Sequence, residues 1–181
     1  MYRQCTTEKT ATQQKIFYEG LYQAMQDQLY SEISITDLCA QTGLSRNIFY
    51  RLFDCKEDVL FALIDSYFFI CAQEVQYDSP EENLLTFFTF WRNQKDFLDL
   101  LNKNHMESLL SVRGSVCSYH INFRTQKLIA QNGMNNNIEM FSFYTSGFLG
   151  LILQWYHNDF SRSPEEMAER TLQFLRNSPF M

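Results

Sequence analysis

Four polar side chains, Arg46, Asn47, Tyr50 and Arg51, have the residue types and the spacing needed to read duplex DNA. On an α-helix they fall on one side, with Ile48 at its border. Arginine and asparagine pair bidentately with guanine and adenine edges in the major groove, and an apolar side chain can meet a thymine methyl group. The sequence therefore predicts a helix that binds nucleic acid.

The opposite side of this segment is apolar. Phe49, Leu52 and Phe53, preceded by Leu44, recur at helical spacing and should be buried. A helix divided in this way is typical of a helix-turn-helix, in which one face anchors the helix and the other enters the major groove.

The residues before this segment supply the rest of a helix-turn-helix. Ser34 and Asp37 have the spacing of a capping box, which predicts a helix start. Gly43 permits the left-handed backbone that ends such a helix, and Ser45 can cap the next one. We therefore expect two short helices joined by a tight turn, followed by a longer helix from about Lys56.

Phosphate contacts would complete the interface. Hydroxyl and amine groups are common donors to phosphate oxygens, and the first turn of a helix adds backbone N–H groups. The predicted DNA-binding residues are Thr36, Ser45, Arg46, Asn47, Ile48, Tyr50, Arg51 and Lys56.

The segment ITDLCAQTGLSRNIFYRLFDCKEDVL, residues 35–60, resembles the DNA-binding head of TetR-family transcriptional regulators. The matching positions are Asp37-Leu38-Cys39, Gly43-Leu44-Ser45, Tyr50, Phe53, Lys56-Glu57 and Leu60. The resemblance implies an all-α protein with a three-helix DNA-binding head, residues 1–55, and a larger helical body for ligand binding and dimerisation, residues 56–181. It also implies a homodimer that binds a palindromic operator and represses transcription until a ligand releases it.

Composition favours the same fold class. The 181-residue chain is 45% hydrophobic and 16% aromatic, with only three prolines and six glycines, which is typical of an all-helical protein. Its net charge is −6, and the first 57 residues carry six basic and seven acidic side chains. Because phosphate neutralisation supplies much of the affinity for DNA, we expect modest and salt-sensitive binding.

Helical periodicity covers most of the chain. We expect helices near residues 10–28, 56–76, 82–91, 95–102, 137–157 and 164–176, and one or two helices over 105–131 with Gly114 as a candidate break. Met1 to about Glu8 is polar, and we expect this end to be frayed.

Two roles are open for the aromatic side chains of the body. They can form plain core, or they can line an effector cavity that prefers a small apolar or aromatic ligand. The candidate lining residues are Phe87, Phe88, Trp91, Phe97, His105, Met106, Phe123 and Tyr144.

The expected helix over residues 137–157 is apolar on nearly all sides, so it needs more cover than one small body can easily provide. Gly147 and Gly150 would let another backbone approach it closely. In TetR-like proteins the last two long helices form a four-helix bundle across a two-fold axis, and the C-terminal segment looks like that pair. The predicted dimer-interface residues are Phe141, Phe148, Leu151, Ile152, Trp155, Met167, Thr171 and Leu175.

Other function classes have little support in the sequence. Five cysteines without a CxxC pair indicate reduced thiols in a cytoplasm, and three dispersed histidines do not form a metal-binding motif. The apolar runs are too short to span a bilayer. Without a nucleophile elbow, a P-loop or a dinucleotide fingerprint, we expect neither an enzyme nor a cofactor.

Two further interpretations stay open. The weakly charged head would also suit a TetR-like co-activator, or a protein-interaction module with weak DNA binding. Alternatively, the chain could be a ligand-binding bundle or an enzyme that carries the head, which a deep cavity with convergent polar groups would reveal.

Overall fold

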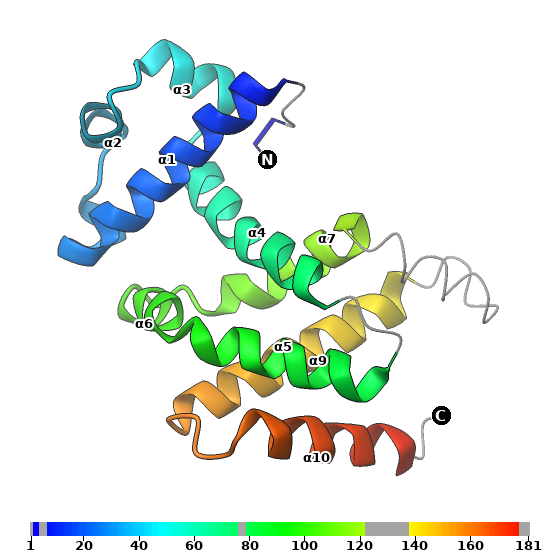
Figure 1. Ribbon diagram of the computed structural model, residues 1–181. Coiled ribbons are helices and arrows are strands. Elements are labelled where there is room, and N and C mark those ends of the chain that lie inside the picture. The colour runs from blue at the N-terminus through cyan, green and yellow to red at the C-terminus, as the bar shows by residue number, and fades with distance from the viewer. Residues whose placement is uncertain (1, 4–6, 76–78, 122–137, 178–181) are drawn as a thin grey trace. The chain divides into compact units, whose positions relative to one another are not determined.

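The computed structural model describes residues 2–3, 7–75, 79–121 and 138–177, with the side chains at 118–121, 138–141 and 144 excluded. Within these ranges every regular element is helical, which confirms the all-α fold class (Figure 1). The elements are α1 (Glu8–Asp27), a short 3-10 helix (Tyr30–Glu32), α2 (Ile35–Thr42), α3 (Arg46–Leu52), α4 (Lys56–Glu74), α5 (Pro80–Asn93), α6 (Lys95–Lys103), α7 (Ser108–Ile121), α9 (Ile138–His157) and α10 (Pro164–Asn177).

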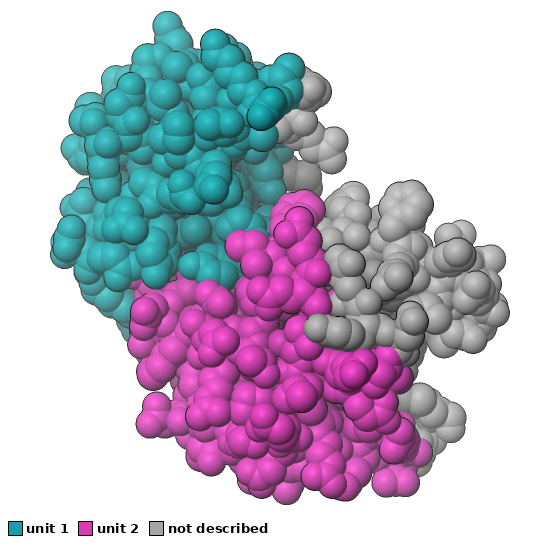
Figure 2. Space-filling view, in the orientation of Figure 1, with its two compact units in different colours: residues 1–67, 103–105 teal, residues 68–102, 106–181 magenta. Residues whose placement is uncertain are grey.

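The chain forms two compact units, which Figure 2 shows in different colours. Unit 1 contains residues 1–67 and 103–105, and unit 2 contains residues 68–102 and 106–181. Helix α4 therefore begins in unit 1 and ends in unit 2. Lys103, the last residue of α6, and the two residues that follow it also belong to unit 1.

Unit 1 is built around aromatic packing between α1 and α3. The ring of Phe17 on α1 meets Phe49 and Phe53 edge to face, with centroids 5.4 and 5.8 Å apart. Such contacts stabilise a small core beyond the burial of area alone. Helices α1 and α2 also cross closely, because a side chain at Gly20 would lie 2.5 Å from the Thr42 methyl group.

Unit 2 pairs α5 with α10 and α7 with α9. Between α5 and α9, the ring of Phe88 meets that of Trp155 at 5.6 Å, and both side chains are buried. Helix α7 runs without interruption through Gly114, so the prediction of a possible helix break at this glycine is wrong. A β-carbon at this position would lie 2.2 Å from a Leu149 methyl carbon, so this glycine permits close packing of α7 on α9.

Candidate nucleic-acid interface

Helices α2 and α3 form a compact helix-turn-helix whose ends are fixed by local hydrogen bonds. The Ser34 hydroxyl accepts from the Asp37 N–H at 3.1 Å, and the Asp37 carboxylate accepts from the Ser34 N–H at 3.1 Å. Gly43 ends α2 with φ +68°, and the Ser45 hydroxyl accepts from the Ile48 N–H at 3.3 Å. The predicted capping box, left-handed turn and N-cap are therefore all confirmed.

The apolar side of α3 is held firmly from behind. Phe49, Leu52 and Phe53 are buried as expected, and Leu44 is half-buried. The rings of Phe49 and Phe53 lie 5.5 Å apart and share contact with Phe17 of α1. A seven-residue helix is marginal by itself, so this packing keeps α3 in one orientation.

The polar side of α3 faces solvent. Arg46, Asn47, Tyr50 and Arg51 are exposed and Ile48 is half-buried; we call these five residues the recognition face. The Tyr50 ring is half-exposed and rests edge-on against Phe49, with centroids 5.3 Å apart. The recognition face therefore joins four exposed polar side chains to one short and well-supported helix.

Both arginines of the recognition face are oriented by unit 1 itself. The Arg46 guanidinium donates to the Thr36 hydroxyl of α2, and the Arg51 guanidinium donates to the Gln13 side-chain oxygen of α1 at 2.7 Å. A guanidinium carries five N–H donors, so one internal bond positions the group without exhausting it. The structure thus brings Thr36 and Arg46 together.

The hydrogen bonds of Lys56 are made with residues outside the recognition face. Its ammonium group donates to the Tyr30 and Ile33 carbonyls at 2.7 and 2.6 Å and lies 4.1 Å from the centre of the Tyr30 ring. These contacts hold the 3-10 helix and the entrance to α2. The predicted phosphate contact by Lys56 stays a prediction, and two of the three ammonium donors are already engaged.

Among the ionisable groups in and beside the helix-turn-helix, Asp37 and Tyr30 have shifted pKa values. Hydrogen bonds from the Ser34 side chain and backbone lower the pKa of Asp37. Burial raises the pKa of the Tyr30 phenol above its usual value, with a further contribution from nearby Glu57. Both groups therefore favour their usual charge states near neutral pH, with Asp37 ionised and Tyr30 neutral.

Residues 103–105 place two more polar contacts on unit 1. The Lys103 ammonium donates to the Gln26 carbonyl near the end of α1 at 3.2 Å. The Asn104 side-chain oxygen accepts from the Tyr30 N–H at 2.7 Å. The 3-10 helix that leads into α2 is therefore held from α4 and from the segment after α6.

The residues predicted to line an effector cavity are only partly brought together. Phe88, Trp91 and Phe97 are fully buried in unit 2, with Phe87 and Met106 half-buried there. His105 is exposed and belongs to unit 1. Phe123 and the side chain of Tyr144 lie outside the described residues.

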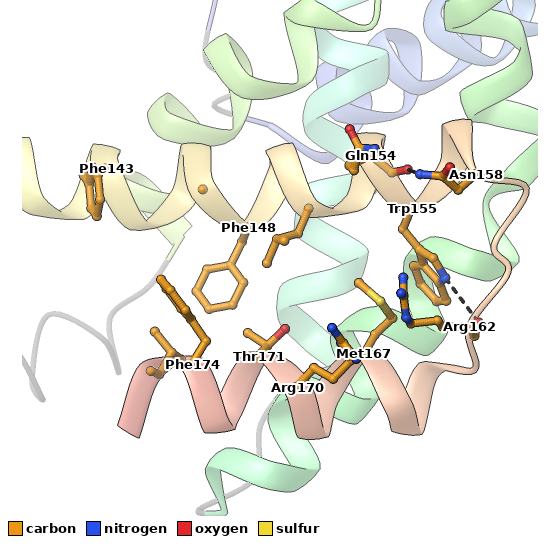
Figure 3. A pocket seen from close by; sticks show the side chains of 13 residues that line it. Phe143, Phe148, Gln154, Trp155, Asn158, Arg162, Met167, Arg170, Thr171 and Phe174 are labelled. Carbon is orange, nitrogen blue, oxygen red and sulfur yellow. Dashed lines mark hydrogen bonds between the residues drawn. The ribbon is translucent and has the colours of Figure 1, made fainter. Parts of the chain in front are cut away.

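A groove between α9 and α10 gathers most of the predicted dimer-interface residues (Figure 3). It has a volume of about 530 Å³, and Phe143 and Phe174 at its surface are 69% and 68% exposed. Six of the eight predicted residues line it: Phe148, Leu151, Trp155, Met167, Thr171 and Leu175. Ile152 is instead fully buried, and the Phe141 side chain lies outside the described residues.

Polar groups border this α9–α10 groove, which is otherwise apolar. Arg162 and Arg170 lie among its lining residues, and the Trp155 indole N–H donates to the Arg162 carbonyl at 3.2 Å. Gly147 also lines the groove, but a β-carbon there or at Gly150 would meet open space. Among the described residues, no other backbone approaches either glycine closely, so the close approach that the sequence suggested stays a prediction.

Some residues that shape the interface were not predicted from the sequence. Gln13 orients Arg51 from another helix, and Tyr2 and Arg3 contact the region of α3 and α4 instead of fraying. For these contacts, the sequence offered one signal, which was the basic residue Arg3 near the N-terminus. In the α9–α10 groove, Phe143 and Phe174 carried an apolar signal that did not distinguish exposure from burial.

The described parts of the chain contain neither a candidate metal cluster nor a candidate membrane-spanning helix. There, no three His, Cys, Asp or Glu side chains are grouped so that they could hold a metal ion. Over the same ranges, no helix combines the length and the apolar character needed to cross a bilayer.

The comparisons with known proteins identify the family. A TetR-family model described as "Transcriptional regulator C-terminal region" matches residues 78–177, which is more than half of the chain. Among solved structures, the chain is similar to the TetR family repressor AlkX from Dietzia sp. strain DQ12-45-1b, implicated in biodegradation of n-alkanes, with 13% identity and a TM-score of 0.49 over 90% of this chain and 92% of that chain. No curated protein matches the chain. The family match confirms what residues 35–60 predicted: the chain belongs to the TetR family of transcriptional regulators.

Proposed function

We propose that this protein is a sequence-specific DNA-binding repressor that binds a palindromic operator as a homodimer and is released by a small ligand. The observation that carries the proposal is the recognition face, which is polar, exposed and supported from behind by buried phenylalanines. A short rigid helix with this division can enter a major groove without unfolding any part of the core.

The residue types suggest how the contacts are shared. Arg46 and Asn47 lie in the first turn of α3, where side chains reach base edges, and Ile48 beside them suits a thymine methyl group. Tyr50 and Arg51 lie one turn later and suit phosphate oxygens. Thr36 and Ser45 would add phosphate contacts around this centre, whereas the Lys56 ammonium group already bonds two carbonyls and serves mainly the fold.

A second copy of the chain is the proposed occupant of the α9–α10 groove. Its exposed phenylalanines form an apolar surface of the kind that marks protein–protein contacts. Helices α9 and α10 from two copies would form a four-helix bundle around a two-fold axis. The two copies of α3 would then meet half-sites about one DNA turn, or roughly 34 Å, apart.

Ligand release is the remaining part of the proposal, with residues 1–55 as the DNA-binding head and 56–181 as the ligand-binding and dimerisation body. Among the described residues, the buried Trp91 indole N–H has no hydrogen-bond partner within the protein, so a ligand that bound beside it would gain by offering an acceptor. Such a ligand would act through α4, which starts in unit 1 and ends in unit 2.

In vitro selection tests this function directly. The full chain is incubated with a random-sequence duplex library at low salt, because its net charge of −6 weakens binding to phosphate. We expect an enriched motif with two-fold symmetry, and a scrambled duplex serves as the control. Enrichment of no motif would contradict the proposal and would favour the protein-interaction role, which a pull-down would then address.

A further inference from the structure

The C-terminal end of α3 lacks the usual helical partners for its carbonyl groups. As in any α-helix, its last four carbonyls have no N–H group within the helix from which to accept a hydrogen bond. The Phe49 carbonyl accepts from the Phe53 N–H at 2.9 Å. The carbonyls of Arg51 and Leu52, the last two residues of α3, instead accept from a residue near the N-terminus of the chain.

That residue is Arg3. Its backbone N–H donates to the Leu52 carbonyl at 3.2 Å, and its guanidinium donates to the Arg51 carbonyl at 3.3 Å. The same guanidinium lies 3.5 Å from the Asp54 carboxylate, although both side chains are more than half exposed, so this ion pair adds little. Arg3 therefore supplies a C-cap for α3 from a distant part of the sequence, with a positive charge at the negative end of the helix.

Two neighbouring contacts anchor this segment. The Tyr2 hydroxyl donates to the buried Asp65 carboxylate of α4 at 2.6 Å, and the Tyr2 ring lies 6.3 Å from that of Phe53. The buried Gln14 side chain of α1 donates to the Arg3 carbonyl at 2.7 Å. Tyr2 and Arg3, which we call the N-terminal strap, thus connect α1, α4 and the end of α3.

We propose that the N-terminal strap positions the recognition face and so sets operator affinity without touching DNA. Tyr50 and Arg51 lie in the last turn of α3, the part of the helix that the strap caps. Loosening this end would let both side chains move relative to Arg46 and Asn47, which lie at the other end. Tyr2 and Arg3 are positioning residues, and their effect on DNA rests on the proposed function of α3.

The alternative role for a basic N-terminal residue is a flexible arm that contacts DNA phosphates. The contacts of Arg3 favour the strap instead, because its guanidinium is directed at the Arg51 carbonyl and the Asp54 carboxylate. Tyr2 also distinguishes the strap from a flexible arm, because its hydroxyl donates to the Asp65 carboxylate, which is only 3% exposed. Loss of that hydroxyl changes no charge.

Hydrogen exchange of the free full-length protein tests the strap without DNA. In Tyr2→Phe and Arg3→Ala we expect the amides of residues 49–53 to exchange about fivefold faster, the change that corresponds to losing one hydrogen bond. Arg3→Lys, which keeps a donor and the charge, should restore most of the protection. Lys9→Ala removes another exposed cation near the N-terminus and serves as the matched control.

DNA binding completes the test with a duplex obtained by selection. We expect Tyr2→Phe and Arg3→Ala to weaken binding about fivefold while the slope of affinity against salt stays unchanged. A slope reduced by about one in Arg3→Ala, with exchange unaltered, would overturn the strap in favour of a phosphate contact. Faster exchange with unchanged DNA affinity would equally overturn the positioning role.

These two measurements also separate the strap from the proposed function. If hydrogen exchange is unaltered in both variants, the proposed role of the N-terminal strap is overturned, even if the wild-type protein binds DNA tightly. If exchange responds and the wild-type protein selects no DNA, the proposed function fails and the positioning of a DNA contact fails with it. Thermal unfolding of each variant would show that the fold is retained.

Discussion

The recognition face on α3 and the α9–α10 groove are both surfaces that the described part of the chain leaves exposed, but their chemistry is opposite. The recognition face exposes two arginines, an asparagine and a tyrosine over a buried aromatic layer. The α9–α10 groove exposes Phe143, Leu151 and Phe174, with its polar groups at the border. Exposed polar side chains need no explanation, whereas a contiguous apolar surface indicates a partner.

The comparison shows how each surface would find its partner. A polar row can stay in water until it meets a polyanion, and its affinity then depends on salt. An apolar groove gains free energy by leaving water, so its partner should itself be apolar. The two surfaces should therefore respond to different substitutions, and each has a matched control in the same chain.

The largest expected effect comes from placing a charge in the α9–α10 groove. In Phe174→Asp the carboxylate would be buried without a partner in the proposed dimer, weakening it by about 3–5 kcal/mol. The monomer should keep its stability, because Phe174 is 68% exposed in the chain alone. Sedimentation equilibrium measures the change in the dimer dissociation constant.

Phe69→Asp provides the control for this substitution. Phe69 is a half-exposed phenylalanine on α4 that does not line the α9–α10 groove, so its replacement should leave the dimer intact. Equal dissociation of both variants, or an intact Phe174→Asp dimer, would show that the groove is not the interface.

The next largest effects distinguish the roles of two basic residues, Arg46 and Lys56. Arg46→Ala should weaken binding to a selected duplex by about 1–3 kcal/mol, because it removes a donor to base edges. Lys56→Ala should instead lower the free energy of unfolding by about 1–3 kcal/mol, because its ammonium group bonds the Tyr30 and Ile33 carbonyls. Fluorescence anisotropy and urea denaturation measure the two quantities.

Salt dependence decides the role of Lys56. Its removal should leave the slope of affinity against salt nearly unchanged if the ammonium group serves the fold. A slope reduced by about one, with unaltered stability, would show that Lys56 neutralises a DNA phosphate as the sequence suggested. Arg92→Ala, an exposed arginine on α5, is a control for the loss of one positive charge.

Much of unit 1 could be predicted because its signals are local. Each signal involves residues within a few positions of one another. Examples are the Ser34–Asp37 capping box, the left-handed Gly43 and the helical spacing of buried residues around Phe49. Such features depend on backbone geometry and helical periodicity, which a sequence states directly. The prediction of the exposed and buried sides of α3 is therefore confirmed.

The features that could not be predicted depend on partners far away in the sequence. Lys56 bonds carbonyls 23 and 26 residues earlier, and Arg3 bonds the Arg51 carbonyl 48 residues later. Gly114 was considered as a break because glycine disfavours helices, but its helix continues where Leu149 packs against it. Local composition contains no information on such neighbours, so only the fold reveals them.

The smallest expected effect is a pH dependence of the free energy of unfolding that comes from Asp37 at the start of α2. The folded-state pKa of Asp37 is lowered, mainly by the Ser34 side-chain hydrogen bond, so its carboxylate favours the folded state at pH values above the unfolded pKa near 3.8. This contribution decreases as pH falls from there through the folded pKa and is absent below it. Ser34→Ala should therefore lose less stability than the wild type between neutral and strongly acidic pH, as thermal unfolding would show. Ser31→Ala, an exposed serine in the same unit, should behave as the wild type, and identical acid sensitivity in all three proteins would mean that this cap does not stabilise α2 through its charge.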